Sequence, residues 1–229
     1  MKHTQIVWRE FLSGVKDELP ILAGVIPFGM IYGILALGAG LSTTEAQAMS
    51  AIIFAGSAQF MLVQLAGVGT PALVMILTGF VINLRHALYS ASIAPYTRQL
   101  TLPWKALMAY LLTDEAYAVV ITYYHQGDEH KHKHWYFLGA GLALWGSWQL
   151  SSAVGIFLGA QVPPGWSLDF TLALTFIALV IPTLNDRASV LAAIAAGIIA
   201  IVAAGLPYKL GLLTAALVGI VVGLWGEER

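Results

Sequence analysis

The sequence predicts an all-α, polytopic helical membrane protein with seven or eight transmembrane helices. Hydrophobic residues make up 59% of the chain and charged residues only 10%, whereas a soluble domain normally carries about 25% charged residues. The apolar residues form long continuous runs, which excludes an outer-membrane barrel with its alternating pattern. A net charge of −1 offers no basic surface for nucleic acid, and the absence of cysteine excludes disulfides and thiolate metal sites.

The long apolar runs define the individual spans, because a bilayer crossing requires about 20 mainly apolar residues. Before the first run, Lys2–Glu18 mixes charged and apolar residues and predicts an amphipathic lead-in rather than a cleaved signal peptide. The last two spans are short and form either two thin spans or one re-entrant unit. In chain order the predicted spans are Ile21–Leu41, Ala46–Ala66, Pro71–Tyr96, Lys105–Tyr124, Trp135–Ala160, Leu168–Leu184, Ser189–Leu206 and Lys209–Trp225.

Two recurring motifs indicate that the transmembrane region is duplicated. Gly56-Ser57-Ala58-Gln59-Phe60 returns as Gly146-Ser147-Trp148-Gln149-Leu150, and residues 81–87 are loosely matched by residues 180–188. Three spans in each copy give the second copy the opposite orientation, which is the inverted three-plus-three repeat of many transporters. The predicted organisation is one transmembrane transport domain over 1–229, with repeat one at about 20–98, repeat two at about 104–187 and C-terminal helices at about 188–226.

The basic residues of the short loops predict the orientation in the membrane. A cytoplasmic N-terminus leaves only Arg98, Lys105 and Lys209 on the outer side, and the other basic loop residues face the cytoplasm. The sequence therefore predicts a multi-pass protein of a bacterial inner membrane with its N-terminus inside. If Pro71–Tyr96 is instead a hairpin, every later segment has the opposite orientation.

Three ionisable residues fall inside predicted spans. Arg85, Asp114 and Glu115 each cost about 2.5–3.5 kcal/mol at the centre of a transmembrane helix. Two interpretations stay open: an ion pair that fixes the helix register, or a site in which Arg85 binds a substrate carboxylate and an acidic residue binds an ammonium group or a coupling proton. His86 is a further coupling candidate, because histidine titrates near neutral pH, or else a buried histidine bonded to a carbonyl.

Helix-breaking residues lie near these positions. Pro27 and Gly29 predict an interruption of the first span, and Pro182 predicts a corresponding interruption in the second half. Asn83 is the matching polar position of the first half, where Pro71–Tyr96 is either one long helix or two half-helices. Interrupted helices are typical of transporter sites, although membrane helices also tolerate proline and glycine for packing.

Two glutamines and three aromatic residues complete the candidate binding set. Gln59 and Gln149 stand beside small residues in the repeated motif, where they either bridge helices or bind a ligand. Phe28, Phe60 and Trp148 are candidates for the wall of an apolar side-chain pocket.

The sequence predicts no enzyme, cofactor or metal site. Histidines and lysines alternate in the charged loop His125–His134 without the spacing of a closed zinc site, so the loop is interpreted as solvated. Nucleophile elbows, zinc-protease motifs and phosphate-binding glycine loops are absent from the sequence. Energy for transport would therefore come from an ion gradient, a substrate gradient or a separate subunit.

Three sequence blocks resemble the AzlC-type branched-chain amino acid permeases, the large subunits of bacterial branched-chain amino acid exporters. They are Phe54–Phe60, Leu84–Tyr89 and Leu112–Tyr117, and the likeness extends from Gly14–Pro20 through the eighth span. Asn83 stands where some members of that family have an aspartate, so the resemblance implies no carboxylate-based coupling at this position. It implies export of valine, leucine and isoleucine, with methionine as a further candidate, together with a small AzlD-type membrane partner.

These observations predict an ion- or proton-coupled secondary exporter. Arg85 would bind the substrate carboxylate, and Asp114 or Glu115 the ammonium group or a proton. Two alternatives are a passive channel for small neutral solutes and a scaffold subunit that binds nothing itself. Saturable flux with counter-transport argues against the channel, and substrate binding by the purified chain argues against the scaffold.

Overall fold

The computed structural model describes residues 2–125, 132–161, 181, 184–207 and 210–227. Within these residues the regular structure is helical and no strand is present, in agreement with the predicted all-α class. They divide into two compact units, one of residues 1–64 and 79–162 and the other of residues 65–78 and 163–229. The single transport domain predicted for the whole chain stays a prediction.

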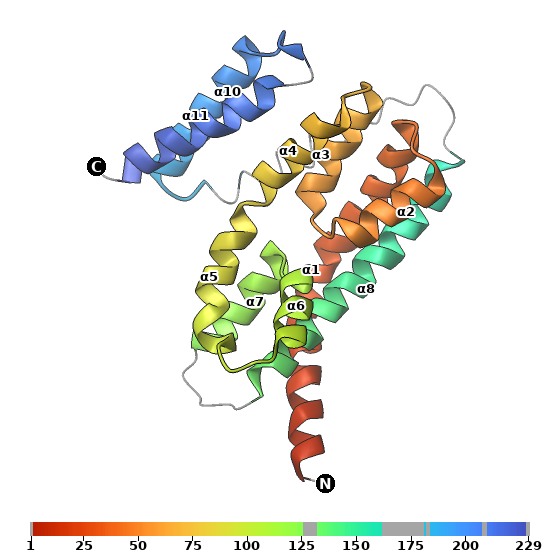
Figure 1. Ribbon diagram of the computed structural model, residues 1–229, viewed down its shortest axis with the longest axis vertical. Helices are drawn as coiled ribbons and strands as arrows, with labels where there is room; N and C mark the ends of the chain where they lie inside the picture. Colours follow the sequence, from red (N-terminus) through yellow and green to blue (C-terminus); the bar gives the residue numbers. More distant parts are fainter. Residues whose placement is uncertain (1, 126–131, 162–180, 182–183, 208–209, 228–229) are drawn as a thin grey trace. The chain divides into compact units, whose positions relative to one another are not determined.

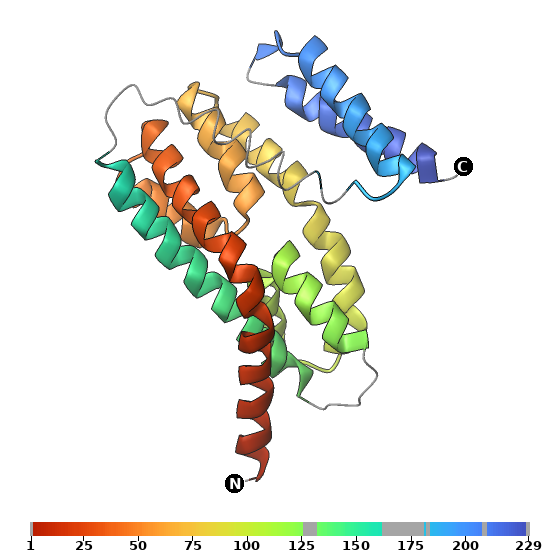
Figure 2. The ribbon, with the colours of Figure 1, turned by 180° about the vertical axis from the view of Figure 1, so that it is seen from behind.

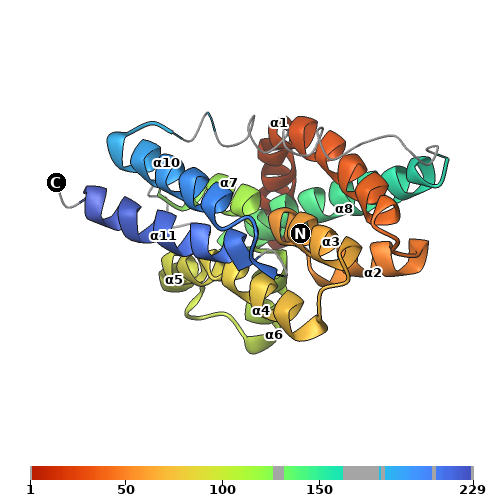
Figure 3. The ribbon, with the colours of Figure 1, turned by 90° about the horizontal axis from the view of Figure 1, so that it is seen from above.

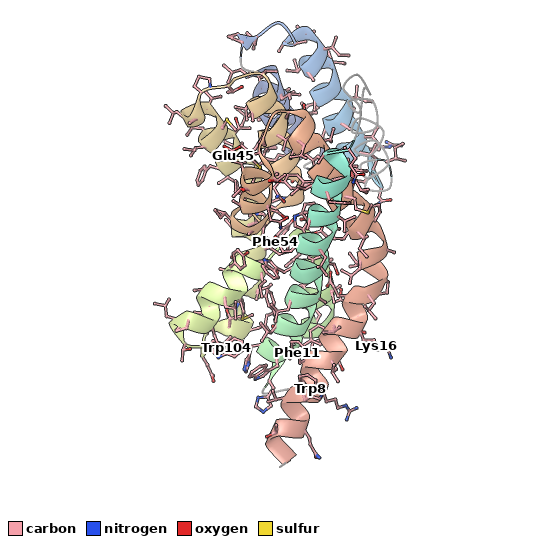
Figure 4. All side chains as sticks on the ribbon, turned by 90° about the vertical axis from the view of Figure 1, so that its right-hand side faces the viewer. Trp8, Phe11, Lys16, Glu45, Phe54 and Trp104 are labelled. Carbon is pink, nitrogen blue, oxygen red and sulfur yellow. The ribbon has the colours of Figure 1, made fainter. Side chains whose placement is uncertain are left out.

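The first unit is organised around two long helices, α1 (Lys2–Gly38) and α8 (Lys133–Gly159). They have 37 and 27 residues, and at 1.5 Å per residue α1 is longer than the roughly 30 Å of a bilayer core. The two helices run side by side (Figures 1 and 2). The lead-in segment and the first predicted span are thus one helix. Lys16 lies on the side of α1 away from α8, and Trp8 and Phe11 lie toward its N-terminus (Figure 4).

Glycines allow α1 and α8 to approach closely. A Cβ atom on Gly33 would lie 2.5 Å from the Ile156 backbone nitrogen, and one on Gly155 would lie 2.1 Å from the Met30 carbonyl oxygen. Gly14 is opposed in the same way by the Tyr136 backbone. Such small-residue seams replace the hydrophobic effect as the source of helix association in a membrane.

The interruption predicted at Pro27 and Gly29 is wrong, because α1 continues through both residues and also through Pro20. A proline inside a helix removes one hydrogen bond without ending the helix when neighbouring helices hold it in place. Gly29 has a packing role instead, since a Cβ atom there would lie 2.1 Å from the Ser151 hydroxyl oxygen of α8.

Local turn chemistry ends α1 and begins α2 (Thr43–Ile52). Gly40 has a φ of 90°, and the Leu41 N–H donates to the Ala36 carbonyl, which is a Schellman-type termination that favours glycine. Ser42 and Glu45 then form a capping box at the start of α2. Hydrogen bonds from the Ser42 hydroxyl and backbone N–H hold the pKa of Glu45 below its ordinary value.

Two predicted spans are each divided into two short helices. Ala46–Ala66 contains α2 and α3 (Gly56–Gly67), separated at residues 53–55, where Figure 4 shows Phe54. The carbonyls of Ser50 and Ala51 at the end of α2 accept hydrogen bonds from Gln149 and Tyr110, at 3.0 and 2.6 Å. These side chains satisfy carbonyls that a continuous helix would satisfy itself.

Lys105–Tyr124 is divided in the same way, into α6 (Leu102–Leu111) and α7 (Asp114–His125). Leu112 is extended, with φ −80° and ψ 102°, and the Thr113 hydroxyl accepts a hydrogen bond from the Ala116 N–H at 3.3 Å. Predicting one continuous helix here was wrong, because hydropathy measures apolar length and does not detect a local cap.

The segment predicted as Pro71–Tyr96 is a bent helix rather than a hairpin. It comprises α4 (Ala72–Asn83) and α5 (Arg85–Thr97), with only Leu84 between them (Figure 1). Leu84 keeps helical dihedral angles, and both the Leu84 and Ala87 N–H groups donate to carbonyls three residues earlier. The bend is therefore a tightened turn next to Asn83.

In the second unit, α10 (Arg187–Val202) and α11 (Leu210–Glu227) lie side by side (Figure 3). Their contact is again made by small residues, since a Cβ atom on Gly219 would lie 3.1 Å from that of Ala196. The helix α10 begins at Asp186, whose carboxylate accepts hydrogen bonds from the Ser189 N–H and hydroxyl, and these bonds lower the pKa of Asp186.

Three described helices are long and apolar enough to cross a membrane: Thr4–Gly38, Ala72–Thr97 and Leu210–Glu227. Large apolar side chains such as Ile76 and Leu88 are mostly exposed, as expected of surfaces that face lipid. The count of seven or eight spans stays a prediction, because most of Leu168–Leu184 lies outside the described residues.

The inverted repeat also stays a prediction. Its two matching motifs have different local structures: Gly56–Phe60 begins the short helix α3, whereas Gly146–Leu150 lies inside the continuous helix α8. The second loose match, residues 180–188, lies largely outside the described residues.

Candidate functional site

The N-terminal ends of three short helices meet at one arginine. The Arg85 guanidinium donates to the Asp114 carboxylate at 3.0 Å and to the Ser57 hydroxyl at 2.8 Å. Arg85 begins α5, Asp114 begins α7, and Ser57 is the second residue of α3. The starts of α3 and α7 each carry a partial positive charge that favours negatively charged groups, whereas α5 continues from α4 through the tightened turn at Leu84. The breaks that divide the predicted spans therefore lie beside the candidate site.

The Arg85–Asp114 ion pair is only partly covered. The exposed fractions of the two side chains are 29% and 40%, within the part of the chain that the structure describes. The pair is the structural alternative considered from the sequence, but its exposure leaves both groups within reach of a ligand. The Arg85 Nε atom is buried and has no hydrogen-bond partner among the described residues, so the guanidinium retains donor capacity.

An aromatic cluster, formed by Phe28, Tyr32, Phe60 and Trp148, lies on the other side of the start of α3. The Phe28 and Phe60 ring centroids are 4.4 Å apart, and Trp148 lies 6.2 Å from Phe28 and 6.0 Å from Tyr32. The cluster brings together the three aromatic residues predicted from the sequence. Tyr32 is an additional member, fixed by a hydrogen bond from its hydroxyl to the Ala46 carbonyl at 2.7 Å.

Gly56 connects the aromatic cluster to the arginine. A Cβ atom on Gly56 would lie 3.1 Å from the Trp148 ring and 3.5 Å from the Phe28 ring. The next residue, Ser57, accepts the hydrogen bond from Arg85. The cationic side chain of Arg85 and the aromatic rings therefore lie against two consecutive residues, Ser57 and Gly56. Sequence analysis placed this motif in a continuous helix and did not identify Ser57 as the contact of Arg85.

Several buried polar atoms around this junction have no hydrogen-bond partner among the described residues. Gln59 is completely buried beside the Tyr32 hydroxyl, and neither of its amide atoms has a hydrogen-bond partner in good geometry among the described residues. A buried polar group without a partner costs about 1–3 kcal/mol. The other unpartnered atoms near the junction are Asn83 Oδ1, His86 Nε2 and Trp148 Nε1.

Gln149 differs from Gln59, because both the nitrogen and the oxygen of its amide form hydrogen bonds. Its Nε2 donates to the Ser50 carbonyl at 3.0 Å, and its Oε1 accepts from Gln47 at 2.9 Å. Both partners belong to α2. The structure thus supports helix bridging as the role of Gln149, one of the two roles considered from the sequence.

This arrangement makes a stability prediction. We expect Gln149→Leu to lower the free energy of unfolding by about 1–3 kcal/mol, because the Ser50 carbonyl at the end of α2 loses its donor. Thermal unfolding of the purified protein in detergent measures the change. Gln161→Leu is the matched control, since the same substitution there is made at an exposed position. Equal melting temperatures for the two variants would contradict the bridging role.

His86 lies against an aromatic stack rather than in the ion pair. Its ring is 5.8 Å from that of Tyr89, which stacks on Tyr117 at 4.5 Å. The Tyr117 hydroxyl also hydrogen-bonds to Ser92 at 3.0 Å, which joins α7 to α5. The stack holds the two helices that carry Arg85 and Asp114 in register.

Glu115 follows Asp114 at the start of α7. A second carboxylate, that of Glu18, lies close enough to Glu115 for an electrostatic interaction. Glu18 of α1 is completely buried, and the carboxylate of Glu115 interacts with it electrostatically. Sequence analysis assigned Glu18 to the lead-in segment and did not include it in the site. Its place in the block Gly14–Pro20, which carries part of the family resemblance, was the available signal.

Two predicted features fall outside the described residues. Pro182 lies there, so its predicted helix break stays a prediction. Residues 126–131 of the histidine-rich loop lie there as well. The described part of that loop includes His134, whose ring lies 4.8 Å from the Trp104 ring.

Comparison with known proteins gives consistent matches along the chain. A family model described as AzlC protein matches residues 20–162. The inner membrane protein YgaZ of Escherichia coli K12 is 26% identical over 225 residues, which cover 94% of this chain and 91% of that protein. An uncharacterized membrane protein of Archaeoglobus fulgidus is 30% identical over 223 residues, covering 95% and 96% of the two chains.

A third relative has a more specific name. The branched-chain amino acid transport protein AzlC of Bacillus subtilis 168 is 30% identical over 182 residues, which cover 79% of this chain and 70% of that protein. No solved structure matches the chain.

Proposed function

The chain belongs to the AzlC family of membrane transport proteins, and from this premise we propose that it is a secondary transporter that exports branched-chain amino acids. The observation that carries the proposal is the junction at Gly56 and Ser57. There the cationic side chain of Arg85 lies next to an aromatic wall. An amino acid with an apolar side chain presents a carboxylate close to a hydrocarbon group.

In the proposed complex, the substrate carboxylate binds Arg85 and takes the place of Asp114. Arginine suits this role because its planar guanidinium binds carboxylates through two parallel hydrogen bonds. Asp114 or Glu115 then receives the substrate ammonium group or a coupling proton. Gln59 supplies a buried hydrogen-bonding group, and His86 remains a candidate for proton coupling.

The substrate side chain is proposed to pack against Phe28, Phe60 and Trp148. An apolar pocket distinguishes side chains that differ by one methylene by only about 1–3 kcal/mol. The transporter should therefore accept valine, leucine and isoleucine together, with methionine as a further substrate. The name of the Bacillus subtilis relative supports this substrate class.

Four further features belong to the proposal. The protein lies in a bacterial inner membrane with its N-terminus in the cytoplasm, and its core is an inverted three-plus-three repeat followed by C-terminal helices. It works with a small AzlD-type membrane subunit. Export is proposed to be coupled to an ion or proton gradient; the absence of a nucleotide-binding motif from the sequence is compatible with this and also with a substrate gradient or a separate energising subunit.

The experiment is efflux of labelled valine from preloaded cells that express the chain, the small partner, both or neither. Saturable efflux that is accelerated by external unlabelled valine supports the exporter. Efflux that does not saturate and shows no counter-transport would identify a passive channel. Substrate binding by the partner alone, with none by this chain, would identify a scaffold. The same measurement is made with labelled leucine, isoleucine and methionine. Unchanged efflux of all four amino acids would contradict the substrate class.

Gly56 provides a prediction on substrate size. We expect Gly56→Val to raise the KM for leucine by at least about tenfold and the KM for valine less, because the added methyl groups meet the Trp148 and Phe28 rings and shorten the pocket. Competition between labelled leucine and valine measures the ratio. The control is Gly146→Val, where a Cβ atom has no neighbour within 4 Å. An unchanged leucine-to-valine ratio in Gly56→Val would contradict the position of the pocket.

A further inference from the structure

Glu18 is a buried carboxylate that the transport site described above does not use. Its exposed fraction is 0%, and neither carboxylate oxygen has a hydrogen-bond partner among the described residues. It lies on α1, which packs against α8 along most of its length and also contacts α7 and α2. An ionised carboxylate without a partner is very costly in such a setting, because burial removes its hydration.

The charged and titratable groups around Glu18 explain what it can bind. The carboxylate of Glu115 on α7 and the phenol of Tyr136 on α8 both lie close enough to Glu18 for an electrostatic interaction with it. Among the described residues, no lysine or arginine forms a salt bridge or hydrogen bond with Glu18. Two buried carboxylates that lie near each other with no cation paired to them are most stable when one of them carries a proton.

A route from the surface leads to this pair. The Tyr136 hydroxyl donates a hydrogen bond to the exposed Asp17 carboxylate at 2.8 Å. Asp17 and Tyr136 line a groove of about 410 Å³ between α1, α7 and α8. Tyr136 thus lines the groove and also lies close enough to Glu18 for an electrostatic interaction between the two side chains. On the inner side, Glu115 directly follows Asp114, the partner of Arg85.

We propose that Glu18 and Glu115 form the proton-binding pair of the transporter, and that the pair exchanges its proton through the groove at Asp17 and Tyr136. The inference rests on the proposed transport function. One proton binds to the pair when the site is free of substrate. The substrate ammonium group, held on Arg85 by its carboxylate, binds Glu115 only after that proton has left toward the groove.

This competition has a direct consequence for coupling. Because the ammonium group and the proton require the same carboxylate, each substrate that binds releases one proton, and each substrate that leaves allows one proton to return. Such exchange lets an inward proton gradient drive outward transport of amino acid. This exchange uses only the residues named above: Arg85, Glu115, Glu18, Tyr136 and Asp17.

The experiment uses infrared spectroscopy of the purified full chain without substrate. At neutral pH we expect a band of a protonated carboxyl group that disappears in Glu18→Gln, with the melting temperature unchanged or raised. Glu45→Gln is the control, because Glu45 is exposed and lies in the capping box. A band of equal intensity in Glu18→Gln would overturn the proposal. Loss of the wild-type band on adding Na⁺ at constant pH would identify a sodium site and would also overturn it.

A second measurement separates this inference from the transport function. Valine binding is measured by calorimetry, and proton release is measured with a pH-sensitive dye in weak buffer. We expect about one proton released per bound valine in the wild type, none in Glu18→Gln and recovery in Glu18→Asp. Binding with undiminished proton release in Glu18→Gln would contradict the proton-binding pair. Absence of valine binding would contradict the proposed function, while the infrared band would still test the pair.

Discussion

Replacing Arg85 by alanine is expected to abolish valine efflux. A carboxylate bound through two charge-assisted hydrogen bonds loses about 1.5–3 kcal/mol for each bond removed. The loss of both corresponds to at least a ~100-fold weaker interaction. We expect Arg85→Lys to be nearly as defective, because an ammonium group does not reproduce the planar fork that also contacts Ser57. Efflux from preloaded cells, normalised to the amount of protein in the membrane, measures the effect.

A double variant separates substrate binding from a purely structural ion pair. If Arg85 only neutralises Asp114, the variant Arg85→Ala with Asp114→Ala should recover transport, because no unpaired charge is left. If Arg85 binds the substrate carboxylate, the double variant stays inactive. Arg98→Ala, at an exposed position between α5 and α6, is the control for loss of an arginine. Recovery in the double variant would contradict the assigned role of Arg85.

Replacing Gly155 by valine is expected to destabilise the protein severely. A Cβ atom at this position would lie 2.1 Å from the Met30 carbonyl oxygen, so α1 and α8 would have to separate. Overpacking of a rigid contact costs about 1–3 kcal/mol or more, and here the obstacle is backbone on both sides. We expect little folded protein after extraction, measured as the monodisperse fraction in size-exclusion chromatography and as the melting temperature.

Gly146→Val is the matched control for this prediction. It makes the same substitution in the same helix, nine positions earlier in the chain, at a site with no neighbour within 4 Å of a Cβ atom. The helix-propensity cost of valine is therefore equal in both variants. Similar stability of the two variants would show that close approach of α1 and α8 is not what requires glycine at position 155.

Hydropathy was sufficient to predict the long helices. The predicted span Trp135–Ala160 agrees with α8 (Lys133–Gly159) within two residues at each end, and Lys209–Trp225 agrees similarly with α11 (Leu210–Glu227). These helices are continuous, so the length of the apolar run is the length of the helix. The first span was too short, because α1 continues into its amphipathic lead-in.

The break between α2 and α3 could not be predicted in this way, because the side chains that stabilise it are not local in sequence. The carbonyls of Ser50 and Ala51 at the end of α2 are satisfied by Gln149 and Tyr110, side chains far away in the chain. At Pro27, by contrast, a local signal for a break was overruled by packing against α8. The position of proline therefore predicted a helix break in α1, where the helix is continuous.

The sequence identified most residues of the candidate site but not how they are arranged in space. Arg85, Asp114 and the aromatic residues Phe28, Phe60 and Trp148 were identified as polar or bulky residues within apolar spans. Their arrangement depends on Gly56 and Ser57 at the start of α3, which became evident only once the break before α3 was known. Glu18 was missed because it precedes the first apolar run, where a charged residue is expected.

The most direct test of the central claim is calorimetric binding of valine and isobutylamine to the purified protein, together with the small partner if efflux requires it. Isobutylamine has the side chain and the amino group of valine but lacks the carboxylate. We predict that valine binds, that isobutylamine binds at least about 100-fold more weakly, and that Arg85→Ala binds both equally weakly. Equal binding of the two compounds by the wild type would show that Arg85 does not recognise the substrate carboxylate.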